Sequence, residues 1–175
     1  NGTDFSYFLQ ALRNIYLHHG GLEKLFTEFS SKLSVQESIS QFKNIFFEIP
    51  HPHRTQKHVS DPIAGSAAKR INMMLRWLVR EDQKGVDFGL WKGISPSKLS
   101  IPLDVHSGNT ARKLGLLARK QNDAKALNEL DISLRQLDVH DPVKYDFCLT
   151  RYGIRKELKM DSLSEFLASD KKVIS

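Results

Sequence analysis

Apolar side chains recur every three or four positions along most of this chain, and this spacing places them on one face of an α-helix. No stretch of useful length alternates apolar and polar residues, as the strands of a half-buried sheet do. No repeat period and no low-complexity tract interrupts the pattern. The sequence therefore predicts an all-α fold, in which helices pack through their apolar faces.

Glycines and capping residues predict where the helices begin and end. Gly20 and Gly21 should end a first helix over 4–18. We expect its apolar face to pack in the core, and this face consists of Phe5, Phe8, Leu9, Leu12, Ile15 and Tyr16. Further helices are expected from Leu22, from the capping box Ser34 to Glu37, at 66–80, from Asp104, from Asn122 or Asp123, from Asp141–Pro142 to Gly153, and from a second capping box, Ser162 to Glu165.

The length and charge of the chain bound its organisation. With 175 residues and 40% hydrophobic content it can bury one core, so we expect a single domain over 1–175. The chain begins at Asn1 rather than at a methionine, so we expect a natural N-terminal portion to precede it. The formal charge of +6 and the isoelectric point of about 9.4 suit a polyanionic partner without requiring one.

The cysteine and histidine content argues against a metal site. Cys148 is the only cysteine, which excludes an intramolecular disulfide, a four-cysteine iron–sulfur cluster and a cysteine-rich zinc site within the chain. His51, His53 and His58 lack an acidic residue or cysteine at ligand spacing, so we expect no metal and no other cofactor. Their segment also holds Lys57, and we expect it to form a basic loop that reaches phosphate.

The sequence shows no membrane or export signal. No apolar stretch reaches the roughly 18 to 20 residues that span a bilayer, and the first residues resemble neither a signal peptide nor a transit peptide. Together with the single cysteine, this predicts a cytoplasmic protein without a membrane partner.

The segment 60–113 contains a candidate catalytic pair. Lys69 should lie in the first turn of its helix, where the positive end of the helix dipole and partial burial would lower the lysine pKa and favour nucleophilic attack. Asp104 precedes a predicted helix and can act as its N-cap. Taken alone, Lys69 is more typical of an ordinary helix-surface lysine, and Asp104 is more typical of an ordinary N-cap.

The loop between these two residues carries two aromatic side chains, Phe88 and Trp91. They can cover the edge of the core, which we favour, or they can stack on a nucleobase.

The segment 60–113 resembles the helix-hairpin-helix superfamily of DNA glycosylases, and in particular the 8-oxoguanine glycosylases. The resemblance rests on Gly65-Ser-Ala-Ala-Lys69, Ile101-Pro-Leu-Asp104-Val-His106 and Arg112-Lys-Leu-Gly-Leu116. The separation of Lys69 from Asp104 (104 minus 69, or 35 positions) and the segment Asp141-Pro-Val-Lys-Tyr-Asp146 are more similar to the archaeal members. The whole chain also resembles an uncharacterised bacterial family that is known only as a domain of unknown function. The residues that carry this second resemblance are Gly20-Gly21, Arg70-x-Asn72, Leu75-Arg76-Trp77 and Asp141-Pro142.

The glycosylase resemblance implies an activity and a set of roles. The expected protein excises an oxidised purine such as 8-oxoguanine from double-stranded DNA, acts as a β-lyase and is a monomer. Lys69 would form the Schiff base, and Asp104 would stabilise positive charge on the sugar. Substrate-binding candidates are Asp146, Asp141, Trp91 and Phe88, and candidates for contact with the DNA backbone are Lys57, Gly65, Arg70, His106, Arg112 and Lys113.

Two other classes of function remain open at this point. A non-catalytic module could bind DNA or RNA with the same fold, and an all-α domain could bind other proteins without any nucleic-acid role.

Overall fold

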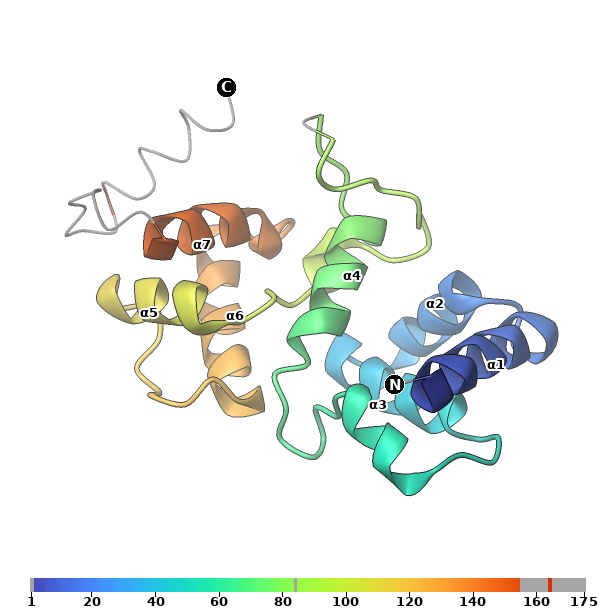
Figure 1. Cartoon of the computed structure of the whole chain (residues 1–175). Helices are drawn as coiled ribbons and strands as arrows, with labels where there is room; N and C mark the ends of the chain where they lie inside the picture. Colours follow the sequence, from blue (N-terminus) through green and yellow to red (C-terminus); the bar gives the residue numbers. More distant parts are fainter. Residues whose placement is uncertain (1, 84, 155–163, 165–175) are drawn as a thin grey trace.

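The computed structural model describes residues 2–83, 85–154 and 164. Three helices form one side of the molecule: α1 (Gly2–His18), α2 (Leu22–Lys32) and α3 (Val35–Phe46), with α1 and α2 both packed on α3 (Figure 1). The capping box at the start of α3 is confirmed, because the Ser34 side chain accepts from the Glu37 amide while the Glu37 carboxylate accepts from the Ser34 amide.

Helix α4 (Lys69–Val79) stands between this group and the rest of the chain (Figure 1). A 3₁₀ helix, η1 (His53–His58), and a turn at 61–66 lead into it from α3. A long loop with a short 3₁₀ helix, η2 (Pro96–Lys98), leads out of it. The other side of the molecule consists of α5 (Val105–Lys113), α6 (Ala124–Leu137), η3 (Pro142–Tyr145) and α7 (Asp146–Ile154), with α5 packed against α7.

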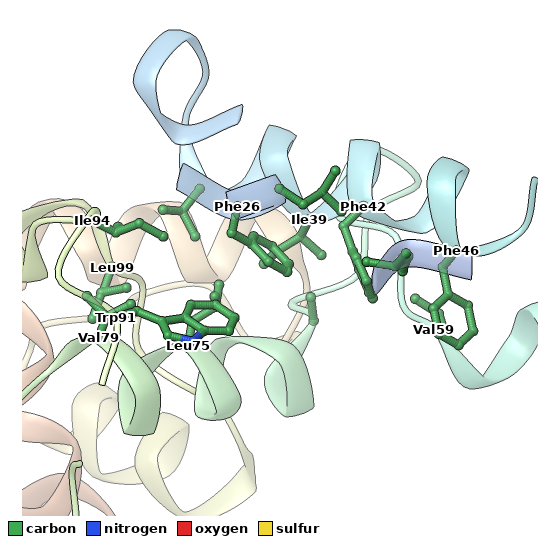
Figure 2. Packing of buried hydrophobic residues seen from close by; sticks show 14 of the residues in the cluster. Phe26, Ile39, Phe42, Phe46, Val59, Leu75, Val79, Trp91, Ile94 and Leu99 are labelled. Atoms are coloured by element: carbon green, nitrogen blue, oxygen red, sulfur yellow. The ribbon is translucent and has the colours of Figure 1, made fainter. Parts of the chain in front are cut away.

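Two hydrophobic clusters hold these elements together. The first joins α1, α2 and α3 to α4 and to the loop after it, and Figure 2 shows the Trp91 ring in it beside Phe26. The second joins α5, α6 and α7 and contains Leu127, Leu130 and Leu149, which are fully buried. Each such side chain contributes roughly 1.5–3 kcal/mol through burial. Because the first cluster includes Ala68 and the second Ala67, the start of α4 is fixed between both.

The structure confirms the all-α class, since the described part of the chain contains no strand and only two isolated bridges. The helix caps at Asp104 and Asp123 are also confirmed, as each carboxylate accepts from a backbone amide three residues later. Cys148 is a buried core residue, as expected of a lone cysteine.

The prediction for the apolar face of the first helix is partly wrong. Ile15 is buried and Phe8 and Leu12 pack against the core, but Phe5, Leu9 and Tyr16 are exposed. The buried face is rotated toward Asp4, Tyr7, Ala11 and Ile15. The polar members of this face explain the error: Tyr7 donates its hydroxyl hydrogen to the Phe46 carbonyl, and Asp4 accepts one from Thr55, so polar groups that a hydropathy pattern excludes are buried with partners.

Several predicted boundaries also differ. The helix expected at 66–80 begins only at Lys69, because Ser66 and the left-handed Ala68 form the turn before it. The helix after Asp104 ends at Lys113, and the apolar residues that follow belong to a turn around Gly115. Gly153 does not stop the last described helix, which continues to Ile154. The predicted capping box from Ser162 to Glu165 lies outside the described residues.

Candidate functional site

The two candidate catalytic side chains meet, although 35 positions separate them. The Lys69 Nζ atom donates to the Asp104 Oδ2 atom at 3.0 Å. Lys69 is the first residue of α4, and the residue before it, Ala68, has a φ of 44° and provides no side-chain cap. The lysine side chain is 46% exposed, so solvent or a ligand can reach the amine.

The Asp104 carboxylate has a structural oxygen and a second oxygen that faces the lysine. Its Oδ1 atom accepts from the Ser107 amide at 2.9 Å and from the Ser107 hydroxyl at 3.1 Å, which caps α5. Burial acts to raise the pKa of Asp104, but hydrogen bonds from Ser107 and Lys69 outweigh it and hold the pKa below its usual range. Asn122 donates to the Asp104 carbonyl at 2.9 Å and so fixes the start of α5 against the loop before α6. The aspartate therefore stays ionised beside the lysine.

The pair lies in the wall of a cavity of about 580 Å³ between α4 and α7. Besides Lys69 and Asp104, the walls are formed by Met73, Arg76, Trp77, Val86, Pro102, Asp146, Phe147, Thr150 and Arg151. Two of these are partly exposed aromatic rings, with Trp77 on α4 37% exposed and Phe147 on α7 49% exposed. A cavity of this size, mostly apolar with a few charged groups, has the usual character of a small-molecule or nucleobase pocket.

Two residues of the cavity wall, Arg76 and Asp146, belong to a buried ionic cluster whose other members do not line the cavity. The Arg76 guanidinium donates to the Asp146 Oδ2 atom, and to the Asp87 Oδ1 atom at 3.0 Å. Arg80 donates to the second Asp87 oxygen at 2.7 Å and to Asp141 at 2.8 Å. Burial raises the pKa of Asp146 to about 6; the Arg76 charge opposes this rise and the Asp104 charge adds to it. The cavity thus contains two carboxyl groups whose pKa values are shifted in opposite directions.

The structure brings together only part of the predicted site. Lys69, Asp104 and Asp146 line one cavity. Trp91 does not line it: only 8% exposed, it packs against Phe26, which confirms the core interpretation for this ring. Phe88 is 58% exposed and lies outside the cavity wall.

The predicted cap at Asp141 is wrong, and the Asp141 side chain lies outside the cavity of Lys69. Its side chain makes no capping hydrogen bond to the 3₁₀ helix η3, because its carboxylate instead accepts from Arg80. It lines a separate cavity of about 440 Å³ with His140 and Lys92, not the cavity of Lys69.

The candidates for contact with the DNA backbone differ in how accessible their side chains are. Arg70, His106 and Lys113 are exposed on α4 and α5, and Lys57 is exposed on η1. Arg112 is committed within the fold, since it donates to the Arg119 carbonyl and to Asn122. Gly65 has a φ of 96°, and no atom lies near where a side chain would be added.

The sequence analysis did not assign Arg76, Trp77, Phe147 or Arg151 to the site. A signal for two of them was present: Arg76 and Trp77 follow Lys69 by seven and eight positions, so all three share one helical face with Met73. Phe147 and Arg151 follow the predicted Asp146 on α7 by one and five positions. They reach the cavity only because α7 packs beside α5.

The described residues, 2–83, 85–154 and 164, show neither a metal-binding cluster nor a membrane-spanning helix. They contain no group of three or more His, Cys, Asp or Glu side chains that could hold a metal ion. None of their helices is both long and apolar enough to cross a bilayer.

Fold and site together define an all-α domain with a lysine–carboxylate pair in a partly aromatic cavity. The sequence profile of the family described as "Protein of unknown function (DUF2400)" matches residues 1–155, and the chain belongs to this family. Comparison with curated proteins and with solved structures gives no match.

Proposed function

We propose that this protein is a DNA glycosylase with β-lyase activity, and that it acts on an oxidised purine such as 8-oxoguanine in double-stranded DNA. The observation that carries the proposal is the 3.0 Å contact between the Lys69 amine and the Asp104 carboxylate in the wall of a cavity with two aromatic rings.

The lysine supplies the nucleophile. After the nucleotide is flipped out of the duplex, the neutral Lys69 amine attacks the anomeric carbon of the sugar and displaces the base. The bond between the anomeric carbon and the ring oxygen of the sugar then breaks, which gives an imine between Lys69 and the opened sugar. β-Elimination from this imine breaks the DNA strand. The Asp104 Oδ2 atom lies where it can stabilise the positive charge that develops on the sugar, while Ser107 keeps Oδ1 fixed.

The cavity can bind the displaced base. Trp77 and Phe147 offer ring faces for stacking, and Arg76 and Asp146 offer a donor and an acceptor for hydrogen bonds to a base edge. Arg151 in the same wall, together with the exposed Arg70 on α4, provides positive charge for a polyanion. These features favour a nucleic-acid substrate over a purely apolar ligand.

Borohydride trapping tests the proposal directly. The purified protein is incubated with a duplex that carries one 8-oxoguanine and, separately, with a duplex that carries one abasic site, and any imine is reduced to a covalent adduct. We expect an adduct on both duplexes with the natural chain and none with Lys69→Gln.

Lys92→Gln is the matched control. Lys92 also pairs with a carboxylate, at 2.5 Å from Glu81, but this pair is exposed and does not line the cavity. The control variant should trap as well as the natural chain. An adduct that persists in Lys69→Gln would refute the role of this lysine, and DNA binding without any adduct would favour a non-catalytic binding module.

A further inference from the structure

Asp146 can hydrogen-bond a base edge, but the lysine mechanism gives this residue no part in breaking the bond to the base. Its side chain lines the cavity, yet it is only 9% exposed and comes from α7, far along the chain from both Lys69 and Asp104. A carboxyl group in such a place is costly unless it is paired, protonated or used.

The two oxygens of Asp146 have different surroundings. Oδ2 accepts from the Arg76 guanidinium. Oδ1 has only a long contact with the Thr150 hydroxyl, at 3.4 Å, and Thr150 is itself a cavity residue. The oxygen that does not contact Arg76 therefore lies next to another residue of the cavity wall.

Burial favours a proton on Asp146, while the charges around this group act in both directions. Arg76 and Arg80 are surrounded by four carboxylates within ion-pair distance, those of Asp82, Asp87, Asp141 and Asp146. The ionised Asp104, at the start of α5, adds a further negative charge that acts to raise the pKa of Asp146, and Asp104 is itself paired with Lys69. Among the described residues, the remaining charged side chain of the cavity wall is Arg151, five positions after Asp146 on α7.

Asp104 and Asp146 differ in which protonation state their surroundings favour. Asp104 accepts three hydrogen bonds and is held ionised, whereas burial raises the pKa of Asp146 to about 6 against the opposing charge of Arg76. Two carboxyl groups with divergent pKa values in one cavity are typical of a site that uses one as an anion and the other as an acid.

We propose that Asp146 is a second catalytic residue, a general acid that donates the proton on Oδ1 to the base as it leaves the sugar. This inference rests on the proposed glycosylase function. As the Lys69 nitrogen forms a bond to the anomeric carbon, the bond from that carbon to the base nitrogen breaks and its electron pair stays with the base. The proton moves from Asp146 to the base, which leaves neutral, and the Asp146 carboxylate that results is paired with Arg76, which is already in contact.

The acid is needed for release of the base and not for the later chemistry on an abasic site. The test therefore compares single-turnover release of 8-oxoguanine from a duplex with borohydride trapping on an abasic duplex, for the natural chain and Asp146→Asn, between pH 5.5 and 8. Asparagine has the same shape and keeps an acceptor for Arg76, but it has no acidic proton.

The expected result is a selective loss. Base release by Asp146→Asn falls on the order of 100-fold or more, the usual contribution of a general acid, while trapping on the abasic duplex stays within about threefold. Release by the natural chain decreases as the pH rises above the pKa of the acid, and this decrease disappears in the variant. Asp87→Asn, which changes the other partner of Arg76 but not the cavity wall, should release the base almost as fast as the natural chain.

Other outcomes overturn the inference in distinguishable ways. Release that Asp146→Asn leaves unchanged would show that the base needs no proton from this residue, and the proposed function would stand. Loss of abasic trapping in Asp146→Asn would assign Asp146 a structural role instead. A natural chain that neither releases the base nor traps on abasic DNA would remove the proposed function and this inference together.

Discussion

Asp104 combines a structural and a proposed catalytic role, and two substitutions can separate them. Asp104→Ala removes both the cap of α5 and the partner of Lys69. Loss of an N-cap costs about 1 kcal/mol. Since the lysine is 46% exposed, loss of the ion pair adds no more than about 0.5 kcal/mol. The free energy of unfolding should therefore fall by about 1–1.5 kcal/mol, which corresponds to a decrease in Tm of about 2–6 °C for a chain of this size.

Asp104→Asn should differ from Asp104→Ala in its free energy of unfolding but resemble it in the loss of borohydride trapping. Asparagine caps a helix about as well as aspartate, so its free energy of unfolding should stay within about 0.5 kcal/mol of the natural chain. It cannot stabilise a positive charge on the sugar as a carboxylate does, so both variants should lose most of the borohydride adduct.

The assay is urea unfolding followed by circular dichroism, with trapping measured on the same preparations. Ser107→Ala provides the control, because it removes the hydroxyl of the capping box while leaving Lys69 and Asp104 in contact. It should lower stability modestly and retain most of the trapping. Equal destabilisation by Asp104→Asn and Asp104→Ala would refute the capping argument, and full trapping by Asp104→Asn would refute the catalytic one.

Two further predictions concern the fold. Trp91→Ala should lower the free energy of unfolding by about 3–5 kcal/mol, because it opens a cavity beside Phe26. Phe88→Ala, at an exposed position, should change the free energy of unfolding by less than about 0.5 kcal/mol. Similar losses of stability for the two variants in urea unfolding would contradict the placement of the two rings. Burial raises the pKa of Asp131 from 3.8 to about 6, so the folded state binds a proton at Asp131 more tightly than the unfolded state does. The contribution of Asp131 therefore makes the protein more stable as the pH falls from about 6 to about 4. The stability difference between the natural chain and Asp131→Asn should accordingly change by about 2 kcal/mol between pH 7 and pH 4, and a difference independent of pH would refute the assignment.

Much of the local structure could be predicted because it depends on nearby residues. The capping box at Ser34 and Glu37 and the caps at Asp104 and Asp123 each satisfy backbone amides within one turn, so the local sequence is sufficient to identify them. Asp141 shows the limit of the same reasoning. Its sequence context is that of a cap, but Arg80, 61 positions away, offers a charged partner that the local backbone cannot match.

The candidate site was only partly predictable for a similar reason. The motifs around Lys69 and Asp104 identified the pair, yet no sequence pattern could show that Phe147 and Arg151 line the same cavity. Phe88 and Trp91 are separated by two residues in one loop, and their exposure differs because only Trp91 meets α2 in space.

The amino-acid sequence by itself determined the all-α class, most of the helix starts and the identity of the lysine and aspartate, since periodicity, capping and residue chemistry act over short distances. The tertiary structure alone decided which face of α1 is buried, the 3.0 Å approach of Lys69 to Asp104, and the burial of Asp146 beside Arg76. Burial and the sum of surrounding charges set the pKa values of these two carboxyl groups, and both depend on elements that meet only when α4, α5 and α7 pack together.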